Sequence, residues 1–495
     1  MTLRKRDFDD VLQDIGGFGR AQMLFFVVIC YGSAARACLG VAQVFLGKVP
    51  KFHCEGQPTE DPCKATCGQY IFDKSNFSSI VSEWALVCED KEYVGLVQSA
   101  FMFGILLGNI FIGPLADQYG RKLTIVYGHI GMAAFHFAAA YSQSYLQFVI
   151  ARFLVGLVAA GCITTTVVYV MENAPSNWRT MLNTIYGFFY GFGISLLALL
   201  AYFLREWRDL VLYSNVLLLG FICLLWFLPE SPRWLASQGR LGEAEEILFY
   251  LGRRNGVTPV TYDMVSLRGM SNVASTNDVQ KGSVLDGFRT REMRRRMLIL
   301  MFIWMVSTMS YFGLTIGSSN LGGNMYITVA LSGLIELPAK VIGGMISTRF
   351  GRRIAVTSCM MLCGVCCLAV IFLPRMQDGD MSSTQTTIAM IAKMGVSAAF
   401  NIIFLYTGEL LPTVIRSSTF SFCSMTGRIA GIIGPLIAST LGDNIVFLIY
   451  GTTCIIAGIV SIYLPETLNQ PLPDTVADVE NQALQLTEKY KMKEN

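Results

Sequence analysis

Charge and histidine are both scarce in this chain. Charged residues make up 15% of its 495 positions, against about a quarter in a typical soluble domain. It has three histidines, and none has the spacing of a metal-binding pair. No phosphate-binding loop, dinucleotide-binding loop or nucleophile elbow occurs. We therefore expect no enzymatic activity, no metal and no cofactor, and the net charge of +3 requires no nucleic-acid partner.

Long apolar runs are abundant instead, and hydrophobic residues make up 53% of the chain. A helix needs about 20 mainly apolar residues to cross a bilayer. Twelve runs meet this requirement, at residues 21–47, 93–116, 123–141, 146–171, 181–203, 210–228, 297–317, 325–347, 354–374, 387–411, 417–441 and 445–464. One such run is also compatible with a buried core helix, but twelve predict an all-α membrane protein with 12 transmembrane helices.

The sequence also repeats itself. One pattern of tyrosine, glutamate, proline and arginine occurs twice with the same internal spacing, at Tyr169, Glu172, Pro175 and Arg179 and at Tyr406, Glu409, Pro412 and Arg416. Segments 113–122 and 228–231 recur as 344–353 and 464–467 at almost the same shift. The chain is therefore two copies of a unit of roughly 235 residues. We expect two six-helix bundles, at residues 21–228 and 297–464.

Basic residues predict the orientation, because lysine and arginine collect on the cytoplasmic side of membrane proteins. Residues 4–6, Arg121 and the segment 229–296 all fall on one side if every run crosses. We therefore expect both termini in the cytoplasm. Residues 1–20 would form a short amphipathic segment, 229–296 a cytoplasmic linker between the bundles, and 465–495 a polar tail.

The loop at residues 48–92 then lies outside the cell. It holds four cysteines, at Cys54, Cys63, Cys67 and Cys88, and a glycosylation sequon at Asn76. An outside loop is oxidising, so we expect two disulfides, for which three pairings exist. A zinc site is the alternative, but no close cysteine pair or partnering histidine supports it.

Charged residues cluster where the runs meet the cytoplasm. Segment 113–122 (GPLADQYGRK) places Asp117 and Arg121 on the turn between the second and third runs, whereas Thr348 replaces the acid in the second copy. Four more charged residues lie at inner helix ends: Glu172, Arg179, Glu409 and Arg416. We interpret these residues as the ion pairs of an inner gate, with fixed structural pairs as the alternative.

Five cations lie within the apolar runs, where charge is costly and indicates function: Arg36, Arg152, Lys340, Lys393 and Arg428. One acid, Glu336, opposes them there. Arg152 and Lys393 are close enough to the outer ends to reach water with their long side chains. Arg428 and Arg36 are central in their runs, and Lys340 follows Glu336 by four residues, so an intrahelical ion pair is its alternative.

A cavity with surplus positive charge favours anions or carboxylate-bearing zwitterions. Aromatic residues at the middle of the runs would supply an apolar wall: Tyr190, Tyr311, Phe312, Phe400 and Phe404. Such residues more often serve helix packing, which remains the alternative.

Six segments spread over nearly the whole chain carry a family resemblance: 8–22 (FDDVLQDIGGFGRAQ), 113–122 (GPLADQYGRK), 152–156 (RFLVG), 229–235 (PESPRWL), 404–412 (FLYTGELLP) and 464–468 (LPETL). With the cysteine-rich outer loop, they resemble the organic-ion branch of the major facilitator solute carriers. That branch includes the organic cation, carnitine and organic anion transporters. The resemblance implies a major facilitator fold.

The resemblance also bears on the substrate. Cation transporters of this branch carry an acid where this chain has Arg428, whereas anion and carnitine transporters carry arginine. Anion transporters carry lysine at the position of Lys340, and they line their pocket at positions matching Tyr190, Tyr311, Phe400 and Phe404. Their first-helix histidine is missing here, with Leu39 near its place. Phe312 and segment 318–324 are closer to the carnitine type.

We therefore predict a monomeric, polyspecific, secondary-active transporter of small organic anions in the plasma membrane, working by alternating access. Exchange for an intracellular carboxylate is implied by the resemblance alone. One alternative is a carrier of zwitterions or organic cations such as carnitine-like compounds, in which Glu336 would matter. An alternative of another class is a membrane receptor that transports nothing.

Overall fold

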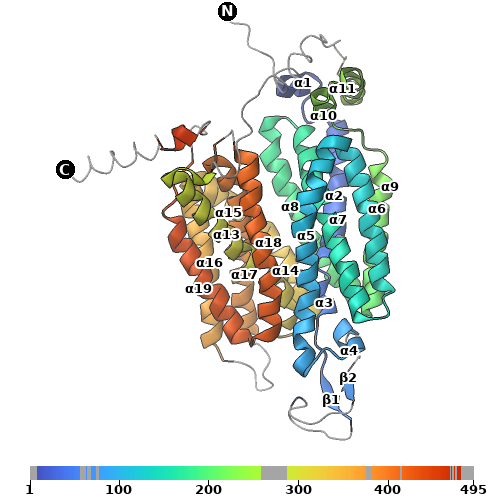
Figure 1. The fold of residues 1–495 in the computed structure, drawn as a ribbon, viewed down its shortest axis with the longest axis vertical. Coiled ribbons are helices and arrows are strands. Elements are labelled where there is room, and N and C mark those ends of the chain that lie inside the picture. Colours follow the sequence, from blue (N-terminus) through green and yellow to red (C-terminus); the bar gives the residue numbers. More distant parts are fainter. Residues whose placement is uncertain are drawn as a thin grey trace, which may run out of the picture. The chain divides into compact units, whose positions relative to one another are not determined.

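The computed structural model describes residues 8–55, 63, 69–73, 77–257, 287–374, 382–412, 415–468, 470, 473 and 476–480. Nearly all of this part of the chain is helical (Figure 1). Twelve helical segments in it are long and apolar enough to span a membrane, which confirms the predicted number. The prediction succeeds because a lipid-embedded segment must satisfy its own backbone hydrogen bonds and must be apolar for about 20 residues.

Six spanning segments come from each half of the chain. The first six are α2 with α3 (Arg20–Gly40 and Gln43–Leu46), α5 (Glu92–Tyr119), α6 (Arg121–Ala140), α7 (Tyr145–Glu172), α8 (Ser176–Phe203) and α9 (Trp207–Leu225). The last six are α13 with η3 (Arg291–Ile316 and Gly317–Asn320), α14 with α15 (Met325–Leu334 and Glu336–Phe350), α16 (Arg352–Phe372), α17 (Ser383–Leu410), α18 (Arg416–Thr440) and α19 (Asp443–Ser461).

The chain divides into two compact units. The first unit comprises Met1–Leu46, Pro50–Trp84 and Ala100–Asp278, and the second comprises Gly47–Val49, Ala85–Ser99 and Val279–Asn495. Within each unit, large apolar side chains stay on the surface, among them Phe203 and Phe372, which are 71% and 86% exposed. Soluble proteins rarely expose apolar area on this scale. The apolar surface therefore fits a lipid environment and a multi-pass membrane protein.

Glycines set how closely the helices approach in the first unit. A Cβ atom added at Gly104 would lie 2.2 Å from the carbonyl oxygen of Phe153, and one at Gly108 would lie 1.9 Å from that of Leu157. Both glycines belong to α5 and both carbonyls to α7. Because membrane helices associate through close backbone packing, these two positions require the absence of a side chain.

The loop after α3 forms a small folded element of the first unit. Strands β1 (Phe52–Cys54) and β2 (Tyr70–Phe72) pair antiparallel, and α4 (Ile80–Trp84) follows. Ser78 donates its N–H to the carbonyl of Arg205 over 2.8 Å, which ties this loop to the start of α9. Three of the expected cysteines are in disulfides, at Cys54, Cys63 and Cys88. Cys67 and Asn76 lie outside the described residues.

Three short helices cover one end of the first unit: α1 (Phe8–Asp14), α10 (Pro232–Ser237) and α11 (Leu241–Asn255). Arg179 Nη2 and Arg233 Nη1 lie 2.5 and 3.5 Å from Asp9 Oδ1. Asn255 donates from Nδ2 to the carbonyl of Ile15 and to Gln22 Oε1, both over 2.9 Å. The N-terminal segment and the first part of the linker therefore pack on the first bundle.

Candidate functional site

The eighth spanning segment contains a proline near its middle. Helix α14 ends at Leu334 and α15 begins at Glu336. Pro338 lies in the first turn of α15 and has no N–H, so it cannot donate to the carbonyl of Leu334. The chain nevertheless stays helical here, because Ile335 has φ −65° and ψ −18° and donates its N–H to the carbonyl of Leu331 over 2.9 Å. An acidic residue, Glu336, directly follows the junction of α14 and α15 within the second unit.

The Glu336 carboxylate is fully buried and faces one neutral hydroxyl and two ammonium groups. Tyr311 donates its hydroxyl to Glu336 Oε1 over 2.7 Å. Lys393 Nζ lies 3.6 Å from the same oxygen, and Lys340 Nζ lies 3.5 Å from Oε2. The intrahelical pair between Glu336 and Lys340, named above as an alternative, is thus formed, and Lys393 adds a second cation to the same carboxylate.

Lys393 does not reach the membrane surface, which corrects our expectation. Its side chain is 1% exposed, and Nζ donates to Ser332 Oγ and lies 5.8 Å from the centre of the Tyr311 ring. Helix α17 begins at Ser383, four residues before the predicted run. Lys393 is therefore ten residues inside the helix, about 15 Å from its start at 1.5 Å per residue, too deep to reach water easily.

Aromatic rings continue from this charged group along the second unit. Tyr311 stacks on Phe400 with centroids 5.4 Å apart, and Phe312 meets Tyr311 edge-on at 5.2 Å. Phe404 lies 5.4 Å from Phe400 and 4.6 Å from Trp304. Four of the five aromatic residues proposed for a pocket wall are therefore in one cluster beside Glu336.

Arg428 lies on helix α18, which packs next to this cluster. A Cβ atom at Gly427 would lie 2.6 Å from Thr308 Oγ1 and 3.2 Å from the carbonyl oxygen of Trp304. The backbone next to Arg428 therefore packs against the helix that supplies Trp304 and Tyr311. The Arg428 side chain is half-buried.

Arg36 and Tyr190 belong to the first unit. Arg36 Nη1 lies 2.9 Å from His129 Nε2, and Nη2 donates to the Tyr186 hydroxyl. These neutral partners tie α2 to α6 and α8, which favours a structural role for Arg36 over a binding role. Tyr190 is half-buried in α8, and its hydroxyl is 3.6 Å from the position of a Cβ atom at Gly40.

Arg152 is the second cation that does not extend to the membrane surface as expected. It is completely buried, with Nη1 donating to the carbonyl of Leu39 over 3.0 Å and the guanidinium 4.8 Å from the centre of the Phe101 ring. Two histidines, His129 and His136, are buried in α6 of the first bundle. His129 has partners, but neither ring nitrogen of His136 is hydrogen-bonded within the described chain.

An ion-pair cluster closes the turn between α5 and α6. Arg121 Nη1 lies 2.6 Å from Asp117 Oδ1, and Nη2 lies 2.9 Å from Glu172 Oε1. The backbone N–H groups of Arg121 and Lys122 both donate to Glu230 Oε1 over 3.0 Å. Burial raises the pKa of the Glu230 carboxyl, and these N–H donors, with that of Ser231, partly oppose the rise.

The second unit repeats this arrangement with Arg352. Its Nε and Nη2 atoms donate to the two oxygens of Glu409 over 3.1 Å each, and its N–H donates to Glu466 Oε1 over 2.8 Å. The Thr348 hydroxyl donates to the carbonyl of Gly344 in its own helix. Among the described residues, no acid contacts Arg352 as Asp117 contacts Arg121.

Arg179 of the repeated pattern does not pair with Glu172. Glu172 pairs with Arg121, while Arg179 pairs with Asp9 and donates from Nε to the carbonyl of Met171 over 3.0 Å. The side chain of Arg416 lies outside the described part of the chain. The acids Glu172 and Glu409 pair instead with Arg121 and Arg352, which begin the helix before their own in each unit.

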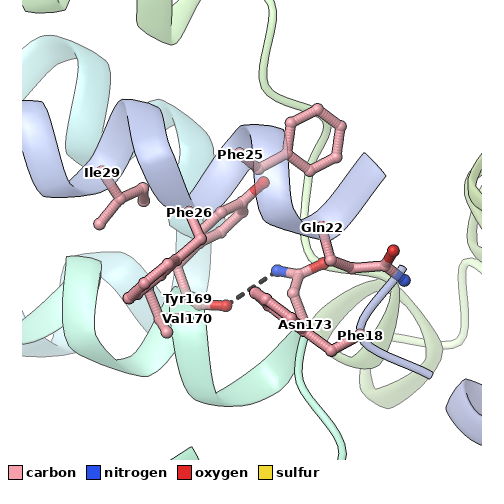
Figure 2. A pocket seen from close by; sticks show the side chains of 8 residues that line it. All are labelled: Phe18, Gln22, Phe25, Phe26, Ile29, Tyr169, Val170 and Asn173. Carbon is pink, nitrogen blue, oxygen red and sulfur yellow. Dashed lines mark hydrogen bonds between the residues drawn. The ribbon is translucent and has the colours of Figure 1, made fainter. Parts of the chain in front are cut away.

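One small pocket of the first unit lies away from these charges (Figure 2). Phe25, Phe26 and Ile29 of α2 face Tyr169 of α7 and its C-cap residue Asn173 across the pocket. Asn173 Nδ2 donates to the carbonyl of Tyr169 over 2.8 Å. Its cavity volume is about 20 Å³, and no charged residue lines it. Pockets for organic ligands usually measure 300–1,000 Å³, so this pocket does not fit an organic ion.

Comparison with known proteins agrees with this architecture. The family described as "Sugar (and other) transporter" matches residues 48–476. A solute carrier family 22 member 15-like protein of Xenopus tropicalis is 34% identical over 484 residues, which cover 97% of this chain and 98% of the relative. The chain belongs to solute carrier family 22 of the major facilitator superfamily. As a member of this family, it is a transporter-type protein and not an enzyme.

Other family 22 relatives carry names of both charge classes. An organic anion transporter 3 of Sus scrofa is 29% identical over 97% of this chain and 95% of its own length. An organic cation transporter protein of Drosophila melanogaster is also 29% identical, over 96% and 94%. Identity to relatives therefore does not separate the two classes.

The solved structures confirm the major facilitator fold of this family 22 chain. The inward-open xylose transporter XylE of E. coli matches with a TM-score of 0.66 and 16% identity, over 91% of this chain and 98% of that one. At this identity the likeness concerns the fold alone.

Sequence reasoning missed two residues of the site in this family 22 member. Lys393 was assigned to the membrane surface, and Ser332 was not singled out. The missing helix hydrogen bond at Pro338 could have been predicted, because a proline inside an apolar run frees a backbone carbonyl. The partnership of Lys393 with Glu336 joins residues 57 positions apart and has no local signal in the chain.

Proposed function

We propose that this solute carrier moves small organic anions across the plasma membrane as a polyspecific, secondary-active carrier. The observation that carries the proposal is that one buried carboxylate, Glu336, faces two lysines beside an aromatic cluster. Arg428 adds a further cation on the helix packed against that cluster. Surplus positive charge in a low-dielectric site attracts anions. The relative named as an organic anion transporter supports the same class.

Lys340 and Arg428 would hold the anionic group in this proposal, and the rings of Tyr311, Phe400 and Phe404 would contact the apolar body. Hydrogen bonds to charged groups contribute about 1.5–3 kcal/mol each. Aromatic contacts add about 0.5–1.5 kcal/mol beyond simple burial and tolerate many shapes. A polyspecific pocket follows, because charge selects the ligand class while the rings impose little geometry.

The sequence has no nucleotide-binding loop, so transport would run on gradients by alternating access of the two bundles. We further propose that the cytoplasm holds both termini, that the carrier works as a monomer and that an intracellular carboxylate is exchanged. The ion-pair clusters around Arg121 and Arg352 would serve as the inner gate.

A carrier of zwitterions or cations is the second candidate. The observation that favours it is the 3.5 Å pair between Lys340 and Glu336, which reduces the charge that Lys340 offers to an anion. In that case Glu336 would receive the quaternary ammonium group of the substrate, and the rings would stabilise it by cation–π contacts. The relative named as an organic cation transporter agrees with this candidate.

The test is uptake of radiolabelled benzoate by cells with equal surface amounts of the wild type, Arg428→Ala and the control Arg349→Ala. Arg349 is exposed at the end of α15. We expect Arg428→Ala to lose most uptake and the control to retain it. Equal uptake by all three would reject the role of Arg428. Uptake of radiolabelled benzoate without uptake of radiolabelled tetraethylammonium would favour the anion carrier, and uptake of tetraethylammonium without uptake of benzoate would favour the second candidate.

A further inference from the structure

The two lysines around Glu336 differ in their access to a ligand. Lys393 is 1% exposed and is held from three sides, by Glu336, by Ser332 and by the Tyr311 ring. The Lys340 side chain is 12% exposed. A ligand entering the second unit can therefore meet Lys340, whereas Lys393 is enclosed by the protein.

The two oxygens of Glu336 also differ. Oε1 accepts the Tyr311 hydroxyl over 2.7 Å and lies 3.6 Å from Lys393 Nζ. Oε2 has no hydrogen bond within the described chain, and its contact with Lys340 is ionic at 3.5 Å. The carboxylate is thus anchored on the Lys393 side and loosely attached on the Lys340 side.

We propose that Lys393 is a positioning residue that sets the substrate charge of the carrier by neutralising Glu336, so that Lys340 remains available to an anion. This inference rests on the proposed function. With both lysines present, two ammonium groups share this one carboxylate in the described part of the chain. An arriving carboxylate takes over Lys340, while Lys393 and Tyr311 keep Glu336 compensated.

The role of Lys393 follows from the cost of a buried, uncompensated charge. A carboxylate that loses one partner in a low-dielectric site must find another or take up a proton. Without Lys393, Glu336 would hold Lys340 as its own partner. The anion would then compete with an internal carboxylate that is already in place.

The experiment measures the concentration dependence of radiolabelled benzoate uptake at equal surface expression. Lys393→Met should raise the KM for benzoate by about 10-fold or more, with a smaller change in the maximal rate, and Lys393→Arg should restore the wild-type KM. The double variant Glu336→Gln with Lys393→Met removes the acid together with its cationic partner. Its KM for benzoate should return to within about threefold of the wild type.

A second double variant, Glu336→Gln with Lys340→Met, is the matched control. It has the same net charge, but it lacks the proposed ligand, so its KM should stay about 10-fold or more above that of the wild type. If Lys393→Met does not reach the surface, the comparison of the two double variants decides alone. Equal KM values for the two doubles, or an unchanged KM for Lys393→Met, would overturn the role of Lys393.

Failure of the proposed function gives a different pattern. If Lys340→Met and Arg428→Ala both transport benzoate like the wild type, the anion site itself is wrong. If these two variants lose uptake while Lys393→Met keeps it, the anion site stands and the positioning role of Lys393 falls.

Discussion

In each unit, one glutamate accepts the first backbone N–H groups of the helix that follows the repeated turn. Glu230 accepts the N–H groups of Arg121 and Lys122, and Glu466 accepts those of Arg352 and Arg353, over 2.8–3.1 Å. The first N–H groups of a helix have no partner within the helix, and a carboxylate also complements the helix dipole. Each glutamate thus replaces a cap that the preceding glycine cannot provide, because Gly120 and Gly351 have no side chain.

Replacing Glu230 tests this cap. Glu230→Ala leaves the N–H groups of Arg121, Lys122 and Ser231 without their acceptor. We expect a loss of about 1.5–3 kcal/mol, seen as a lower melting temperature of the detergent-purified protein. The control is Glu246→Ala, because Glu246 is exposed on α11 and its replacement should change little. Equal melting temperatures for the two variants would contradict the cap.

The close packing of helices α5 and α7 depends on glycine where their backbones meet. At Gly108 a Cβ atom would lie 1.9 Å from the Leu157 carbonyl oxygen, whereas at Gly344 it would have no neighbour within 4 Å. Gly108→Ala should therefore force α5 and α7 apart and cost about 1–3 kcal/mol. Gly344→Ala should be neutral or slightly stabilising, since alanine favours helix. Thermal unfolding in detergent measures both, and a Gly108→Ala protein as stable as the wild type would refute the close contact.

The helices could be predicted from the sequence, but their side-chain partners could not. Membrane insertion imposes a long apolar run on each span, so every span leaves a local signal. The pairing of Arg179 with Asp9 joins residues 170 positions apart, and no periodicity encodes it. Depth was also misjudged for Arg152, because its distance from the helix end does not reveal that it faces the bundle and donates to Leu39.

At the scale of the molecule, gene duplication explains why the same contacts occur in both units. Contacts that occur in one unit alone indicate function. Tyr169 donates its hydroxyl to the carbonyl of Pro229, and Tyr406 donates to that of Pro465, over 3.0 and 2.7 Å. These structural bonds recur in both units. The group around Glu336 belongs to the second unit alone, which fits a specialised role rather than an inherited packing role.

Orientation of the whole chain is tested at the outer loop. If the loop between the first two spans is outside, Asn76 should carry glycan in mammalian cells. Asn76→Gln should then increase electrophoretic mobility, and removal of N-glycans with an amidase should shift the wild type to the same position. A wild-type protein that is insensitive to the amidase at the cell surface would contradict the proposed orientation.

Direct binding tests the central claim that fixed positive charge in the second unit selects anions. Isothermal titration of the purified carrier with benzoate should show an affinity about 10-fold or more weaker for Arg428→Gln than for the wild type, because one charge-assisted contact is lost. The exposed control Arg349→Gln should bind like the wild type. Identical benzoate affinities for the wild type and Arg428→Gln would contradict the account.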